Sequence, residues 1–184
     1  NQSNMYLGYY TANIEYITIP YLPSETQFGR FINYSAIKSI TIPKGITTIA
    51  SSAFMDCCYL ETYSLPPSLT TINPSCFSGN IWLKNITLPY SLETIGGTYT
   101  FRYSSIEELT VPSTVTAIPN YFVQEAFSLK KLVILGGGTL GTNMCYMCKS
   151  LESLTIPINV AEITGSMCDS CVSLREVNFI NTQP

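Results

Sequence analysis

The 184-residue sequence predicts an α/β solenoid of about eight coils. A unit anchored by proline recurs every 22 or 23 residues, and each copy opens with the same short apolar alternation. Apolar residues make up 46% of the chain and charged residues only 11%, which is ample material for a core. A fixed period in this range is typical of a solenoid, whose units bury their apolar faces by stacking on one another. The anchor positions are Pro20, Pro43, Pro66, Pro89, Pro112, Leu135, Pro157 and Ile180.

The repeat divides the chain into a short N-terminal segment and one solenoid domain. Residues 1–13 fit the repeat poorly, and we expect an N-terminal cap or a worn repeat there, followed by the solenoid over 14–184. The first coil keeps the repeat length but loses much of the pattern, as terminal repeats commonly do. The chain does not begin with Met, so we expect it to be a fragment of a longer protein. The later coils begin at Ile37, Leu60, Leu83, Ile106, Leu129, Leu151 and Leu174.

Each coil opens with the pattern L-x-x-I-x-I-P, which predicts a brief strand with one buried face. Proline at its end stops the ladder. A second apolar pair follows, such as Ile46 and Ile49, and then an aromatic slot such as Phe54. The stretch Ser51–Cys57 resembles one helical turn with a serine cap, the helical part of the predicted fold. The middle inward column of the strands is Ile17, Ile40, Tyr63, Ile86, Leu109, Leu132, Leu154 and Val177.

The sixth coil departs from this pattern. It is one residue short, and glycines at 136–138 and 141 replace its second apolar pair. We therefore expect a local distortion or a flexible loop in this coil.

The stretch Ile37–Cys57 joins an L-x-x-I-x-I-P strand to I-T-T-I and A-F-x-x-C at 23-residue spacing. In these motifs the chain resembles the BspA-like branch of the leucine-rich repeats, over about residues 14–184. The resemblance implies a curved solenoid with a parallel β-sheet on its concave face. It also implies a place on the surface of a bacterium or a parasitic protist, where such proteins bind host matrix proteins or other cells. A right-handed parallel β-helix is the alternative fold, although it would favour a third strand in place of the A-F-x-x-C turn.

The residue after each opening Leu or Ile alternates in charge through all eight coils. In a stack each of these charges has opposite neighbours on both sides, and we interpret the column as a structural ladder that fixes register. Exposed pairs contribute only about 0–1 kcal/mol each. A binding stripe is the alternative, but alternating signs neutralise it for a singly charged partner. The ladder consists of Glu15, Lys38, Glu61, Lys84, Glu107, Lys130, Glu152 and Arg175.

Two further columns are expected to point outward from the concave sheet. They are rich in threonine and lightly charged, which suits strand packing and offers hydroxyl groups for contacts. These columns form either a ligand-binding face or a surface whose residues only favour strand formation, and both interpretations stay open. The candidate ligand-binding residues are Tyr16, Thr18, Ser39, Thr41, Thr62, Asn85, Thr87, Glu108, Thr110, Lys131, Ser153 and Glu176.

Seven cysteines include two C-x-x-C pairs, Cys145 with Cys148 and Cys168 with Cys171. Their spacing superficially matches a four-cysteine zinc site. The repeat explains the same spacing, because these positions face inward, where free cysteine packs as a small apolar residue. We favour buried thiols. Disulfides between adjacent coils, and a metal held by the four cysteines, are the alternatives.

The composition excludes several classes of function. There is no histidine, which removes Ser-His-Asp and Cys-His catalysis, and no catalytic site or cofactor site is predicted. The net charge of -3 gives no basic footprint for nucleic acid, and no apolar run is long enough for membrane insertion.

We therefore expect a non-enzymatic interaction or adhesion module, secreted or on the cell surface, that binds a protein or a glycan. The signal and anchor would lie outside this segment, and the exposed end of the solenoid could support self-association. A structural spacer that presents another domain is the alternative. A β-helix enzyme that degrades polysaccharides is less favoured, because it would need a cleft with several acids.

Overall fold

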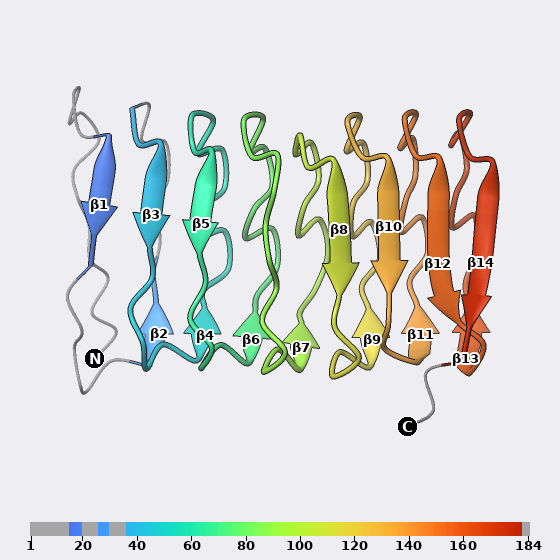
Figure 1. Cartoon of the computed structure of the whole chain (residues 1–184), viewed down its shortest axis with the longest axis horizontal. Coiled ribbons are helices and arrows are strands. Elements are labelled where there is room, and N and C mark those ends of the chain that lie inside the picture. Colours follow the sequence, from blue (N-terminus) through green and yellow to red (C-terminus); the bar gives the residue numbers. More distant parts are fainter. Residues whose placement is uncertain (1–14, 20–25, 30–35, 182–184) are drawn as a thin grey trace.

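The computed structural model describes residues 15–19, 26–29 and 36–181. Within them the chain forms a row of stacked coils, so that sequence position increases steadily along the long axis (Figure 1). Every strand pairing is parallel and joins neighbouring coils. The predicted solenoid with a parallel sheet is thereby confirmed. None of the described residues forms a helix, so the fold is a β-solenoid and not α/β, and no helix there could span a membrane.

The first row of strands follows the opening motif of each coil. Its register places Ile40 between Ile17 and Tyr63, and Leu132 between Leu109 and Leu154, as the repeat predicts. Apolar side chains at alternate positions point into the core and the residues between them face out. The strands of this row are β1 (Tyr16–Thr18), β3 (Ser39–Thr41), β5 (Thr62–Ser64), β8 (Glu108–Val111), β10 (Lys131–Ile134), β12 (Ser153–Pro157) and β14 (Glu176–Ile180).

The fourth coil interrupts the first row. Strands β1, β3 and β5 form one sheet and β8, β10, β12 and β14 another, and between them residues 84–88 form no strand (Figure 1). A single isolated bridge, between Asn85 and Glu108, joins this segment to β8. The prediction of a strand in every coil is therefore wrong for the fourth.

A buried cluster beside this interruption supplies a physical reason. The ring of Tyr63 packs edge-on against Phe54 and Phe77, with centroid distances of 4.9 and 4.8 Å. Its hydroxyl donates to Oδ1 of Asn80 at 2.5 Å, and Nδ2 of Asn80 donates to the carbonyl of Phe54 at 2.8 Å. A tyrosine ring needs more room in the core than the isoleucine of neighbouring coils. We attribute the missing strand of the fourth coil to this cluster.

The second apolar pair of each coil forms a second row of short strands, which run opposite to the first row (Figure 1). The sequence predicted these residues as core without assigning them a strand. Ile49, Ile72, Ile95 and Ile118 are all buried. The strands of this row are β2 (Gln27–Phe28), β4 (Thr48–Ile49), β6 (Thr71–Ile72), β7 (Thr94–Ile95), β9 (Ala117–Ile118), β11 (Gly138–Leu140) and β13 (Val160–Ile163).

The glycine-rich sixth coil is distorted as expected, but it forms the strand β11 and not a loop. Its pairing with β13 shifts register between Gly138 and Thr139. A Cβ atom at Gly136 would lie 1.8 Å from the carbonyl oxygen of Val115, and one at Gly138 would lie 1.9 Å from that of Thr116. The shortened coil therefore lies against the backbone of the preceding one, which only glycine permits.

The aromatic slot forms a continuous stack in the core. Phe54, Phe77 and Phe101 stack with centroid distances of 5.5 and 5.2 Å, and Phe122 meets Phe101 edge-on at 5.4 Å. All four are fully buried, so the prediction of this slot is confirmed. The equivalent Phe31 of the first coil and the proposed cap over 1–13 lie outside the described residues.

The third side of each coil is a run of turns. Ser52 and Asp56 have positive φ values of 54° and 57°, and equivalent residues recur along the solenoid, including Tyr99, Tyr103 and Glu125. Residues in this left-handed conformation cannot continue a right-handed helix. The predicted helical turn at Ser51–Cys57 is therefore wrong.

Candidate ligand-binding face

The outward residues of the first row lie on one side of the solenoid, here called the strand face. Pairing aligns Tyr16 with Ser39 and Thr62, and Glu108 with Lys131 and Ser153. The strand face comprises the candidate residues Tyr16, Thr18, Ser39, Thr41, Thr62, Asn85, Thr87, Glu108, Thr110, Lys131, Ser153 and Glu176. The structure brings these residues together in two aligned columns, apart from the fourth coil, where residues 84–88 form no strand.

Side chains of the strand face are mostly exposed, and some bond to one another across coils. Oγ1 of Thr62 donates to Oγ of Ser39 at 3.0 Å, and Oγ of Ser153 donates to a carboxylate oxygen of Glu176 at 3.3 Å. Tyr16 is 70% exposed at the N-terminal end of the described face. The face thus offers hydroxyl, amide and charged groups of both signs to a partner.

Two steps of the predicted charge ladder are ion pairs. Nζ of Lys38 lies 2.9 Å from Oε1 of Glu15, and Nζ of Lys130 lies 3.0 Å from Oε2 of Glu107. The bonds to these carboxylates raise the pKa of each lysine, and the bond from Lys130 lowers the pKa of Glu107. These side chains are largely solvated, so each pair contributes little to stability, and their role in register stays a prediction.

A groove opens in the strand face where the fourth coil leaves the ladder. Its volume is about 320 Å³. Thr87 and Tyr90 of the fourth coil form one wall, and Glu108 and Thr110 of β8 form the other. The buried apolar residues that line it are Ile86, Leu88 and Pro112. The sequence analysis named Thr87, Glu108 and Thr110, but it did not place Tyr90 beside them.

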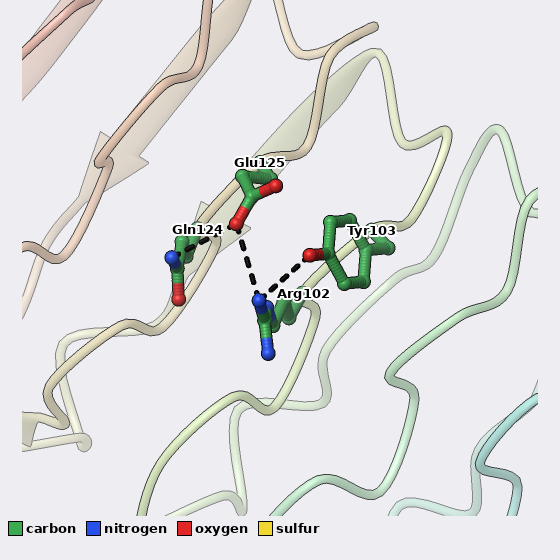
Figure 2. A network of polar contacts seen from close by, with 4 residues as sticks. All are labelled: Arg102, Tyr103, Gln124 and Glu125. Atoms are coloured by element: carbon green, nitrogen blue, oxygen red, sulfur yellow. Dashed lines mark hydrogen bonds and ion pairs between the residues drawn. The ribbon is translucent and has the colours of Figure 1, made fainter.

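A second polar cluster lies among the turns on another side of the solenoid (Figure 2). A terminal guanidinium nitrogen of Arg102 bonds to Oε1 of Glu125 at 3.2 Å and to the hydroxyl of Tyr103 at 2.7 Å. The guanidinium also lies over the rings of Tyr99 and Tyr103, at 4.9 and 4.3 Å from their centroids. Nε2 of Gln124 donates to the same Glu125 oxygen at 2.9 Å.

Sequence reasoning missed this cluster. Arg102 and Glu125 are 23 residues apart, the same interval that pairs Lys38 with Glu15. A search for opposite charges one repeat apart would therefore have found the pair. Because the guanidinium of Arg102 is already bonded to Glu125 and Tyr103, we interpret the cluster as a contact that holds two neighbouring coils together, here called the clamp.

The cysteines of the last coils are thiols in this structure, and Cys57, Cys76, Cys145 and Cys148 are buried. Sγ of Cys148 donates to the carbonyl of Val123 at 3.0 Å, and Sγ of Cys171 donates to that of Cys145 at 3.0 Å. Desolvation raises the pKa of Cys148, and a hydrogen bond with Cys145 raises the pKa of Cys168 to about 12. Such thiols stay protonated at neutral pH.

The alternative of a metal at Cys145, Cys148, Cys168 and Cys171 can be compared with the geometry. Among the residues that the structure describes, no group of three or more histidine, cysteine, aspartate or glutamate side chains is arranged to hold a metal ion. The sulfur atoms of Cys148 and Cys171 are instead donors to backbone carbonyls. Disulfide formation between these coils stays a prediction.

Solved structures of leucine-rich repeat proteins share the fold. The leucine-rich repeat protein of T. pallidum is 21% identical with a TM-score of 0.72, and the match covers 83% of this chain and 73% of that one. The pneumococcal vaccine antigen PcpA is 21% identical with a TM-score of 0.71, covering 91% of this chain and 42% of that one. A leucine-rich repeat protein from Bacteroides ovatus is 21% identical with a TM-score of 0.57, covering 90% and 69%.

The sequence itself carries the family signature. A search of the curated proteins returned no match. The family model for the BspA-type leucine-rich repeat region matches residues 4–130 and 97–183, with six copies of the repeat. These matches span nearly the whole chain and agree with the strand register. The chain therefore belongs to the BspA-type leucine-rich repeat family.

Proposed function

We propose that the chain is a non-enzymatic interaction module of a secreted or cell-surface protein, and that its strand face binds an extracellular protein or glycan. The observation that supports this most directly is the strand face itself. Outward residues from successive coils align into an exposed surface with hydroxyl groups, both signs of charge and one groove. Extended surfaces of this kind are what solenoids offer to partners.

Family membership supports the same function. Relatives of similar fold include a pneumococcal vaccine antigen, which fits an extracellular place for this chain. The absence of histidine removes the commonest acid–base machinery from the whole sequence. The carboxylate of Glu107 is engaged with the ammonium group of Lys130, and Glu108 faces the groove without a second acid lining it.

The test is a binding screen against immobilised extracellular-matrix proteins and a glycan array. The diagnostic variant replaces Tyr16, Glu108 and Lys131 of the strand face with alanine. Its matched control replaces Tyr59, Glu93 and Lys149, which are exposed residues of the same types elsewhere on the solenoid. Thermal unfolding checks that both variants are folded.

We expect saturable binding that the strand-face variant loses by about tenfold or more and the control keeps. Equal binding by both variants would move the contact surface to another side. A folded chain that binds none of these partners would instead support a structural spacer.

A further inference from the structure

The groove between the fourth coil and β8 has two walls of different chemistry over an apolar floor. Tyr90, which is 78% exposed, presents an aromatic ring on one wall beside the hydroxyl of Thr87. Glu108 presents a carboxylate on the other beside the hydroxyl of Thr110. A small cavity with an apolar base and a few placed polar groups is the usual form of a small-ligand site.

The volume of the groove limits the size of its ligand. Pockets that hold drug-sized molecules range over roughly 300–1,000 Å³. At about 320 Å³ this groove is at the lower end of that range. It therefore suits a single ring with its substituents and not a folded segment or a long side-chain cluster.

The charges around the groove favour a neutral ligand. Glu108 has Lys131 as its partner on the adjacent strand and the uncharged Asn85 on its other side. The two formal charges oppose each other across one strand spacing, so neither a cation nor an anion gains much from the site as a whole. A neutral molecule that both donates and accepts hydrogen bonds is able to bond to the carboxylate and to both threonine hydroxyls.

We propose that the groove binds one neutral sugar ring of a glycan. The apolar C–H face of the ring packs on Tyr90, because aromatic rings offer a large apolar surface at low entropic cost. Its hydroxyl groups donate to the carboxylate of Glu108 and exchange hydrogen bonds with Thr87 and Thr110. This assignment rests on the proposed function of the strand face and names the ligand class at one place within it.

The probe is a set of neutral methyl glycosides of glucose, galactose, mannose and N-acetylglucosamine, titrated into the whole chain and followed by protein-observed NMR. We expect at least one of them to saturate with a dissociation constant of millimolar order, as befits a ligand of this size. Tyr90→Ala and Glu108→Ala should each weaken it by about tenfold or more. Glu108→Gln, which keeps an acceptor oxygen, should weaken it by no more than about threefold.

The matched control is Tyr59→Ala, an exposed tyrosine outside the groove. It should bind like the parent chain, and unchanged thermal unfolding should show that every variant is folded. Failure of all four glycosides to saturate, or saturation that survives Tyr90→Ala, would overturn the proposal. So would tighter binding of lysine amide than of any glycoside, abolished by Glu108→Gln, because that would make the groove a cation site.

These outcomes separate the groove from the strand face as a whole. If a partner found in the wider screen depends on Tyr16 and Lys131 but not on Tyr90, and no glycoside saturates, the proposed function stands and the sugar site fails. If the chain binds neither a partner nor a glycoside, both fail.

Discussion

Neighbouring coils meet along a seam, which is closed where their first-row strands pair and open where they do not. The seam between the fifth and sixth coils is closed, and the seam between the third and fourth coils is open. In the first, β8 and β10 pair from Glu108 with Lys131 to Val111 with Ile134, and Glu107 forms an ion pair with Lys130. In the second, no strand pairing joins β5 to the described residues 84–88. The sequences of the two seams fit the same repeat, so the period alone does not decide whether a ladder closes.

The two seams differ in the residue of the middle inward column and in the residue that bonds to it. The closed seam places Leu109 against Leu132 in the middle column, whereas the third coil places Tyr63 there and satisfies its hydroxyl with Asn80. A buried polar pair of this kind holds a defined geometry, because breaking it leaves an unsatisfied group in the core. We attribute the open seam to these two residues, and the groove lies on the other side of the fourth coil, where it faces β8.

The largest effect is expected at the closed seam. Leu132→Ala removes a fully buried side chain between two paired strands and should lower the free energy of unfolding by about 2–5 kcal/mol. Ile86→Ala, at the equivalent position of the open seam, should cost near the low end of that range, about 2 kcal/mol, because the surroundings can relax. Urea unfolding measures both. A larger loss for Ile86→Ala would contradict the difference in packing.

The next effect concerns the polar pair. Asn80→Ala leaves the hydroxyl of half-buried Tyr63 and the buried carbonyl of Phe54 without their partner and should destabilise the chain by about 1–3 kcal/mol. Asn73→Ala is the matched control, since half-buried Asn73 makes one bond, to the carbonyl of Ile49, and its loss should cost about 0.5–1.5 kcal/mol. Equal losses of stability in thermal unfolding would show that the Tyr63–Asn80 pair contributes no more than the single bond of Asn73.

Much of the solenoid could be predicted from the sequence. Because coils stack in register, a 23-residue period predicts which residues are neighbours, and it placed Lys131 beside Glu108 and Phe77 on Phe54 correctly. The strand face was predicted for the same reason. The run of turns was not, because left-handed backbone at residues such as Ser52 carries no glycine to indicate it.

The parts that the sequence did not predict depend on three-dimensional fit. We attribute the open seam to the contact of Tyr63 with Asn80, which lies 17 residues later in the chain. The groove lies between the fourth coil and β8, and the repeat period does not show that Tyr90 lines it. The contacts of Arg102 with the rings of Tyr99 and Tyr103 also depend on side-chain placement, which the repeat period does not give.

Replacing Tyr63 and Asn80 together tests whether these two residues hold the seam open. The double variant Tyr63→Ile with Asn80→Cys gives the third coil the residues that the second has at Ile40 and Cys57. We expect the ladder to extend through the fourth coil, which should slow amide exchange at Asn85 and Thr87 by about tenfold or more. The groove should shrink and glycoside binding should fall with it. Unchanged exchange at these amides would mean that another feature holds the seam open.

The smallest effect is electrostatic. The bond from Lys130 lowers the pKa of Glu107, so this carboxylate stabilises the fold above its ordinary value near 4.5, and the contribution is lost as pH falls through the lowered pKa. Lys130→Met should return the pKa of Glu107 toward its ordinary value in an NMR titration, and added salt should reduce the difference. Lys44→Met, on an exposed lysine remote from the pair, is the control and should leave it unchanged. A Glu107 pKa insensitive to Lys130→Met would exclude the pair in solution.

Native-state amide exchange measures whether the ladder of the strand face is interrupted at the fourth coil. Lys131 and Val133 lie in paired strands, whereas Asn85 and Thr87 form no ladder with β5, and Asn85 has only its isolated bridge to Glu108 of β8. We predict that Asn85 and Thr87 exchange about tenfold or more faster than Lys131 and Val133. Equal protection at all four amides would show that the ladder is continuous in solution and would contradict the open seam.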